Sequence, residues 1–188
     1  MLEVKATRLP EVLILKPRVF GDARGSFVES WNQQRFDEAI GDEVRFVQDN
    51  HSHSLHGVVR GLHYQLPPAA QGKLVRVASG RIFDVSVDMR RSSPRAGQWV
   101  GVELSSENGM QVWIPAGFAH GFMTLSDTAD VLYKTTDFYT PAQERALAWN
   151  DPHVAIDWPV SQLRSAVGLS PKDEAAPAWA ACELFAAE

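Results

Sequence analysis

The chain has 188 residues, of which 45% are hydrophobic and 22% are charged, a balance typical of one soluble globular domain with a substantial core. Eighteen basic residues against 23 acidic ones give a net charge of −5, which argues against the basic surface that general nucleic-acid binding requires. We therefore expect a single domain over residues 1–188 with no nucleic-acid partner.

The single cysteine, Cys182, cannot form a disulfide within the chain, which favours a reducing compartment. No amino-terminal run resembles a signal peptide, and no stretch approaches the roughly 20 apolar residues of a membrane helix. These features predict a cytoplasmic protein with no membrane partner.

Short segments rich in Val, Ile, Phe and Trp recur along the chain between Gly, Pro, Asn and Asp residues, which predicts many strands in a sandwich or barrel. The predicted strands are Val12–Leu15, Ser26–Trp31, Arg45–Gln48, Val58–Tyr64, Lys73–Ala78, Arg81–Asp88, Trp99–Leu104, Gln111–Ile114, Gly121–Leu125 and Val131–Thr135. Alternation in Arg81–Asp88 indicates a half-buried strand, and we expect Asp84 to share the inward face with Ile82. Ser79-Gly80 predicts a tight connection before this strand.

Helix signals are sparse. Asn32–Ile40 starts with a capping Asn and is followed by Gly41, which predicts one short helix. The tail from Asn150 is interrupted by four prolines, so we expect it to wrap over the barrel with a short helix or two. The fold class predicted is all-β with a few short peripheral helices.

Titratable side chains are concentrated between Gln48 and Lys73, where four of the six histidines lie: His51, His53, His56 and His63. A second stretch, Gly109 to His120, has the spacing G-x5-P-x-G-x2-H and resembles the second motif of the cupin superfamily of double-stranded β-helix (jelly-roll) barrels. The first cupin motif, which normally supplies two His and one Glu to a metal, is similar to Gly57–Gly80. Here Gln65 replaces the second His and Lys73 replaces the Glu.

This departure argues against a metal, because a divalent ion needs several imidazole or carboxylate ligands and would be repelled by an ammonium group. A fixed cation can instead stabilise negative charge that develops on a substrate oxygen. We therefore expect no metal and no cofactor.

Seven ordered motifs resemble those of the dTDP-4-dehydrorhamnose 3,5-epimerase family, and the similarity covers nearly the whole chain. They are Phe20–Glu29, Gln48–Ser52, Gly57–Gln65, Pro115–Phe122, Tyr133–Tyr139, Glu144–Arg145 and Leu169–Asp173. The resemblance implies epimerisation of dTDP-4-dehydro-6-deoxy-D-glucose at carbons 3 and 5, by proton transfer through an enolate.

The resemblance also implies the catalytic roles. His63 matches the base and Asp173 the carboxylate that orients it, although Asp84 is a second candidate for this orienting role. Tyr133 matches the proton donor, and Lys73 matches the group that stabilises the enolate oxygen.

The remaining matches imply a dTDP-sugar cradle in a homodimer that shares strands and site residues. Arg24, Arg60 and Lys172 would meet the pyrophosphate and sugar, Tyr139 would stack on thymine, and Phe20 and Phe27 would flank it. The other expected contacts are His120, Gln48, Asp49, Asn50, Glu29 and Glu144. Arg24 and Glu29 are expected to reach the neighbouring subunit's site.

Three alternatives remain open from the sequence. One is a 3-epimerase, 5-epimerase or ketoisomerase acting on a related nucleotide sugar. Another is a metal-dependent cupin oxygenase or isomerase that uses His51, His63 and His120 with Glu29. The third is a non-catalytic sugar-binding cupin. We expect His51 to have a structural or supporting role, and His53 and His56 to lie on the surface.

Overall fold

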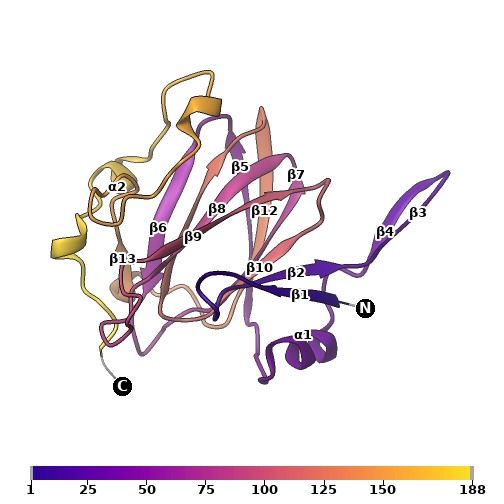
Figure 1. Cartoon of the computed structure of the whole chain (residues 1–188), viewed down its shortest axis with the longest axis horizontal. Helices are drawn as coiled ribbons and strands as arrows, with labels where there is room; N and C mark the ends of the chain where they lie inside the picture. The colour runs from indigo at the N-terminus through magenta and orange to yellow at the C-terminus, as the bar shows by residue number, and fades with distance from the viewer. Residues whose placement is uncertain (1, 187–188) are drawn as a thin grey trace.

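Two antiparallel sheets that face each other form the body of the molecule in the computed structural model, which describes residues 2–186 (Figure 1). The six-stranded sheet has the order β1 (Leu2–Ala6), β2 (Leu13–Pro17), β10 (Gln111–Ile114), β7 (Lys73–Ser79), β12 (Thr128–Thr135) and β5 (Gln48–Leu55). The five-stranded sheet has the order β13 (Glu144–Ala146), β6 (Val59–Gln65), β11 (Phe118–Thr124), β8 (Arg81–Asp88) and β9 (Trp99–Ser105). The all-β fold class is therefore confirmed.

A separate hairpin, β3 (Val19–Asp22) and β4 (Gly25–Val28), extends away from the barrel (Figure 1). All eight of its strand residues are exposed, and Phe27, at 69% exposure, is the most open large apolar residue between positions 2 and 186. The predicted strand Ser26–Trp31 corresponds to β4, but β4 ends at Val28, three residues before the predicted end.

Most other predicted strands are confirmed within a few residues, but Arg45–Gln48 is wrong. Residues 43–47 have no regular structure, and the strand in this region is β5, which starts at Gln48. The apolar Phe46 misled the prediction, because it packs on Trp31 and Trp113 in a side cluster outside the barrel.

The predicted short helix is confirmed as α1 (Gln33–Ile40). The Asn32 side chain accepts a hydrogen bond from the Arg35 backbone N–H, and Gly41 takes a left-handed conformation with φ of 72°. Phe36 is the buried residue of this helix, and it anchors the helix on Trp113.

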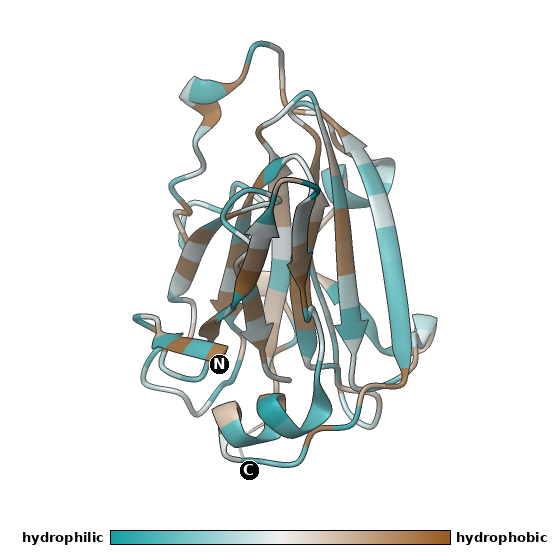
Figure 2. Cartoon of the chain, turned by 90° about the vertical axis from the view of Figure 1, so that its right-hand side faces the viewer, coloured by the Kyte–Doolittle hydropathy of each residue, from teal (hydrophilic) through white to brown (hydrophobic). Residues whose placement is uncertain are grey.

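The interior between the sheets is apolar, and Figure 2 shows hydrophobic residues, in brown, recurring along the central strands. Residues of this core include Val75, Ile82, Leu104 and Val131. The facing of β8 is as predicted, but the strand is buried on both sides rather than half-buried. The reason is the carboxyl-terminal tail, whose Trp158 and other apolar residues cover the outer face in a second core cluster.

Three short helical segments interrupt this tail, where one or two were expected: η2 (Val160–Gln162), α2 (Pro171–Glu174) and η3 (Trp179–Ala181). Another 3-10 turn, η1 (Pro141–Gln143), precedes β13. Among residues 2–186, no helix has the length and apolar character needed to cross a membrane. The predicted turn at Ser79-Gly80 also forms, but it carries the chain from one sheet to the other instead of closing a hairpin.

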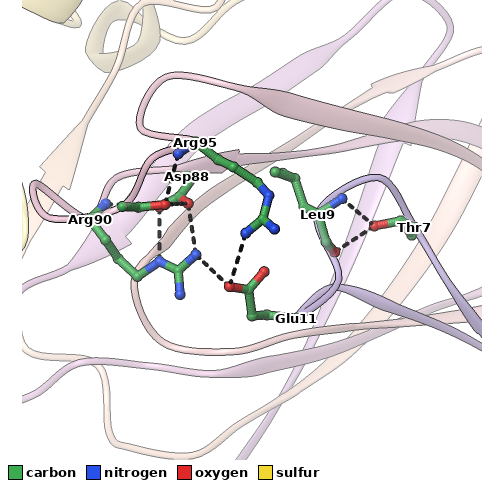
Figure 3. Close-up of polar contacts among 7 residues, drawn as sticks. Thr7, Leu9, Glu11, Asp88, Arg90 and Arg95 are labelled. Carbon is green, nitrogen blue, oxygen red and sulfur yellow. Dashed lines mark hydrogen bonds and ion pairs between the residues drawn. The ribbon is translucent and has the colours of Figure 1, made fainter.

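A polar cluster fastens the connection between β1 and β2 to the end of β8 (Figure 3). Arg90 donates to both oxygens of the fully buried Asp88, at 2.9 and 2.7 Å, and to Glu11 at 2.9 Å. Thr7 closes the same connection by donating to the Leu9 carbonyl at 2.7 Å. Burial alone would raise the pKa of the Asp88 carboxyl, but the bonds from Arg90 and Ser93 hold it below its ordinary value.

Candidate functional site

Two adjoining hollows lie at the mouth of the barrel, with volumes of about 510 and 220 Å³. Both are lined by His63, Lys73 and Tyr133. The larger also contains Arg60, Ser52, Ser170, Asp173, His120 and Phe122, and the smaller contains Gln48, Asn50, Gln65, Tyr139 and Glu144. Most of the candidate residues therefore line two hollows that share His63, Lys73 and Tyr133.

Strand register explains why these side chains meet. His63 on β6 lies opposite His120 on β11, and Tyr133 on β12 lies between Asn50 on β5 and Val75 on β7. The β6–β11 pairing slips between His120 and Phe122. At this slip Gly61 has φ of 101°, and an added Cβ there would lie 2.6 Å from the His120 carbonyl oxygen, so only glycine fits.

His63 is paired with Asp173, which arrives from α2. The Nε2 atom of His63 lies 2.7 Å from Oδ1 of Asp173, whose side chain is 5% exposed. An ionised carboxylate only accepts, so a neutral His63 donates from Nε2 and keeps its lone pair on Nδ1. Although burial raises the pKa of Asp173, donors from His63, Ser170 and the Gly61 backbone hold it below its ordinary value.

Asp84, the second candidate for orienting His63, pairs with His120 instead. Nε2 of His120 lies 2.7 Å from Oδ2 of Asp84, and both side chains are buried. The barrel mouth therefore holds two separate His–Asp pairs, one on each of two neighbouring strands.

Lys73 is the only lysine buried in the part of the chain that the structure describes, with 9% of the residue exposed. Its Nζ donates to the His63 carbonyl oxygen at 3.1 Å. Burial lowers the pKa of Lys73 to about 8, and the charges of Asp84 and Glu144 limit the drop. Lys73 is therefore a cation that titrates close to neutral pH.

Tyr133 is half-buried on the same sheet as Lys73, which faces the sheet that carries His63. Burial raises the pKa of its phenol, whereas the positive charge of Arg60 acts in the other direction. The hydroxyl is thus protonated at neutral pH and able to donate. Arg60 is held by Ser54, which accepts from its Nε at 2.8 Å, and by the His53 carbonyl at 3.1 Å.

The smaller hollow has its own hydrogen-bond network. The Tyr139 hydroxyl donates to Glu144 at 2.7 Å, and Gln48 accepts from the Tyr139 backbone N–H at 3.1 Å while donating to Asn50 at 2.9 Å. Lys172 forms an ion pair with Glu144. Burial alone would raise the pKa of the Glu144 carboxyl, but the hydrogen bonds from Lys172 and Tyr139 lower it below its ordinary value and keep the group charged. The Tyr139 side chain remains 52% exposed.

Six candidate residues lie outside these hollows, and one of them is Lys172, which is held by its ion pair with Glu144. Phe20, Arg24 and Phe27 are on the projecting hairpin, where Arg24 pairs with Asp22 at 2.6 Å. Glu29 follows the hairpin and pairs with Arg35 at 2.7 Å. Asp49 lies on the outer side of β5, because strand alternation directs only its neighbours inward, and it pairs with Lys134 at 2.9 Å.

The four side chains of the alternative metal site do not converge. His51 is 59% exposed and contacts Asp130, and Glu29 is occupied by Arg35. Within residues 2–186, no group of three or more His, Cys, Asp or Glu side chains could hold a metal ion. Gln65, at the position of a cupin metal ligand, instead donates to the Ala69 and Phe138 carbonyls and accepts from the Thr140 N–H.

Two of the other histidines in the stretch contact one carboxylate. His51 and His53 lie 2.9 and 3.0 Å from the same oxygen of Asp130, and His53 is exposed as predicted. The prediction for His56 is wrong, since it is half-buried. Its Nδ1 donates to the Leu125 and Ser126 carbonyls, and its Nε2 accepts from the Arg164 backbone N–H at 3.0 Å.

Ser170 and Ser54 are polar contacts of the site that sequence reasoning did not single out. Ser170 belongs to the Leu169–Asp173 motif, and its spacing of three residues before an acidic side chain is a helix-capping signal that would have indicated it. Ser54 carries no comparable signal, since its role depends on its place beside Arg60.

Comparisons with known proteins agree with this geometry. The sequence profile of the family described as dTDP-4-dehydrorhamnose 3,5-epimerase matches residues 6–181. A protein with that same name from Pseudomonas aeruginosa is 59% identical over 184 residues, covering 97% of this chain and 99% of that protein. Another, from Salmonella typhimurium, is 59% identical and covers 94% of this chain and 95% of that protein.

A crystal structure of the dTDP-6-deoxy-D-glucose-3,5-epimerase from Legionella pneumophila, in complex with dTDP-4-keto-L-rhamnose, superposes with a TM-score of 0.95. It is 49% identical to this chain, and the match covers 100% of both chains. Both the match along the whole sequence and the match of the whole fold lead to one conclusion. The chain belongs to the dTDP-4-dehydrorhamnose 3,5-epimerase family and has that family's isomerase activity.

Proposed function

We propose that this chain inverts carbons 3 and 5 of dTDP-4-dehydro-6-deoxy-D-glucose with His63 as base, Lys73 as oxyanion partner and Tyr133 as acid. The observation that carries this assignment is the pairing of His63 with Asp173 at 2.7 Å, in a hollow whose wall also contains Lys73 and Tyr133. The base can accept a proton, the acid has a proton to donate, and the oxyanion partner can carry a positive charge.

The proton path starts at Nδ1 of His63, which is free because Nε2 faces Asp173. Nδ1 takes the proton from the carbon next to the ketone, and the bonding electron pair moves onto the ketone oxygen as an enolate. Asp173, held ionised, stabilises the imidazolium that forms. Tyr133 then donates its phenolic proton to the opposite face of the carbon, and the ketone reforms.

Lys73 supplies the charge that this enolate needs. A buried ammonium group interacts strongly with a developing oxyanion, since solvent screens its charge less than it screens an exposed one. His120, which is paired with the buried Asp84, lines the same hollow from the other sheet and is a further contact for the sugar. The side chains here do not suit a divalent metal, because Gln65 and Lys73 stand where cupins have a second His and a Glu, and the ammonium group would repel the ion.

The nucleotide end of the substrate is assigned to the smaller hollow. Tyr139 stacks on thymine, Gln48, Asn50 and Glu144 hold polar groups of the nucleoside, and Arg60 and Lys172 meet the pyrophosphate. The pre-formed bonds of Tyr139 to Glu144 and Gln48 support this assignment, because they orient the ring before the ligand arrives.

A homodimer completes the cradle in this proposal. The hairpin carries Phe20 and Phe27, which are 51% and 69% exposed, and Arg24, whose side chain is 90% exposed. An isolated two-stranded hairpin with apolar residues in water is marginally stable, so a second copy is its natural support. Arg24 and Glu29 then reach the partner's hollow, and Asp49 contributes at the rim. Each subunit of this dimer is one domain over residues 1–188, and the enzyme works in the cytoplasm.

Solvent exchange read by NMR tests the chemical assignment. Incubation with the 4-keto sugar nucleotide in heavy water should place deuterium at carbons 3 and 5 with the native chain. His63→Ala should abolish this exchange, whereas His53→Ala is a matched control on an exposed histidine and should retain it. Exchange that survives in His63→Ala would refute the base assignment.

A further inference from the structure

We propose that Ser170 is a positioning residue for the base, and that it acts by fixing the Asp173 carboxylate against His63. This inference rests on the proposed role of His63. It adds Ser170 to the pair of His63 and Asp173, as a residue that the proton transfer itself does not require.

The two oxygens of the Asp173 carboxylate have different donors. Oδ1 lies 2.7 Å from Nε2 of His63, and the Ser170 hydroxyl donates to Oδ2 at 2.7 Å. The torsion that turns an Asp carboxylate is broad and weakly restricted in itself. A bond to each oxygen restricts it, because a rotation that improves one bond lengthens the other.

The same hydroxyl also fixes the backbone of Asp173. Ser170 is the N-cap of α2, and its oxygen accepts from the Asp173 N–H at 3.2 Å. One side chain therefore holds both the amide and the carboxylate of a single residue. Only a hydroxyl or an amide can donate and accept in this way, whereas an Asp cap would accept but repel the carboxylate.

The helix itself offers Asp173 little rigidity. α2 has four residues, far fewer than an isolated helix needs to be stable, so side-chain bonds decide where it lies. His63, in turn, is 29% exposed and lines an open hollow. The orientation of its ring therefore depends on Asp173, and the orientation of Asp173 depends on Ser170 together with the Gly61 backbone N–H.

A capping role and a positioning role predict different outcomes on substitution. If Ser170 served only as a cap, Ser170→Ala would lower stability, while Ser170→Gly would change little, because Gly is tolerated at N-caps. If it positions the base, both variants should lose turnover, and Ser170→Thr should restore it because the hydroxyl returns.

The experiment measures kcat and KM for the full reaction, with thermal unfolding of each variant alongside. We expect Ser170→Ala and Ser170→Gly to lower kcat about tenfold, since a hydrogen bond to a carboxylate is among the stronger ones. KM should stay within about twofold, and Ser170→Thr should keep kcat within about twofold of native. In an Asp173→Ala background, Ser170→Ala should cause no further loss, because its effect passes through that carboxylate.

Three outcomes would overturn the inference. One is native kcat in both Ser170→Ala and Ser170→Gly, and another is a raised KM with unchanged kcat. The third is that Ser170→Ala lowers kcat by the same factor in the Asp173→Ala background as in the native chain. These are separable from failure of the proposed function, which shows as native activity in His63→Ala. Inactive His63→Ala together with fully active Ser170→Gly refutes only the positioning role.

Discussion

Replacing Lys73 with Met should stabilise the fold while it abolishes catalysis. Lys73 has an ordinary pKa of 10.5 and a pKa of about 8 in the folded chain, because burial disfavours the charged form. At about 1.4 kcal/mol per pH unit, keeping this ammonium charged in the fold at neutral pH costs about 3 kcal/mol. Met has a similar shape and no charge, so the variant escapes this penalty.

Part of the gain is offset. The His63 carbonyl loses the donor that lies 3.1 Å away, and a lost hydrogen bond of this kind is worth about 1 kcal/mol. The free energy of unfolding of Lys73→Met should therefore exceed that of the native chain by about 2 kcal/mol at pH 7.

The sign of the pH dependence follows from which state binds more protons. Below pH 8 Lys73 is charged in both states, so the full penalty applies to the native chain. Between about 8 and 10.5 the unfolded chain keeps the proton that the folded chain has released, so native stability rises with pH and the advantage of Lys73→Met shrinks.

Urea unfolding at pH 6.5 and pH 10 measures both effects. Lys16→Met, at an exposed position on β2, is the matched control and should show no pH-dependent difference from native. The reasoning fails if Lys73→Met is less stable than native at pH 6.5, or if its advantage is as large at pH 10 as at pH 6.5.

Three further predictions concern the site. Native kcat should fall as pH rises through about 8, because Lys73 loses its proton there. Asp84→Asn should move this fall in kcat to lower pH, since the Asp84 charge raises the pKa of Lys73. A fall at the same pH in Asp84→Asn would contradict the assignment. Gly61→Ala should destabilise the fold by about 3 kcal/mol in thermal unfolding, because its Cβ would lie 2.6 Å from the His120 carbonyl at a φ of 101°; a native melting temperature would show that the pairing can relax. Tyr133→Phe should lower formation of the inverted product at least about 100-fold but retain some deuterium exchange at the substrate carbons, and loss of both to the same extent would show that the phenol also assists proton removal.

The fold could be predicted from sequence wherever one face of a strand is apolar. Arg81–Asp88 and Lys73–Ser79 show this alternation, and their bounds came out within a residue. β5 could not be found this way, because it runs Gln-Asp-Asn-His-Ser-His-Ser-Leu, with a polar face toward the hollow and a polar face toward solvent. A strand that serves a site on one side and water on the other has no hydrophobic period.

The candidate residues were identified by resemblance, which also gave Asp173 as the first candidate for the partner of His63. Without the resemblance, local sequence does not distinguish Asp173 from Asp84 in this role. The distinction depends on the register of β6 against β11 and on the slip at Gly61, which decide the direction in which each imidazole points. Single-residue register is a property of the packed sheets rather than of local propensity.

The bond between His63 and Asp173 joins residues 110 positions apart, and most strand neighbours in both sheets are also distant in the chain. Such non-local contacts form slowly, because the entropy of closing long loops must be overcome before the contacts stabilise anything. During synthesis, β6 leaves the ribosome long before α2, so the imidazole exists for many seconds without its carboxylate. Catalytic competence is thus acquired last, when the tail docks onto a barrel whose other strands are already present.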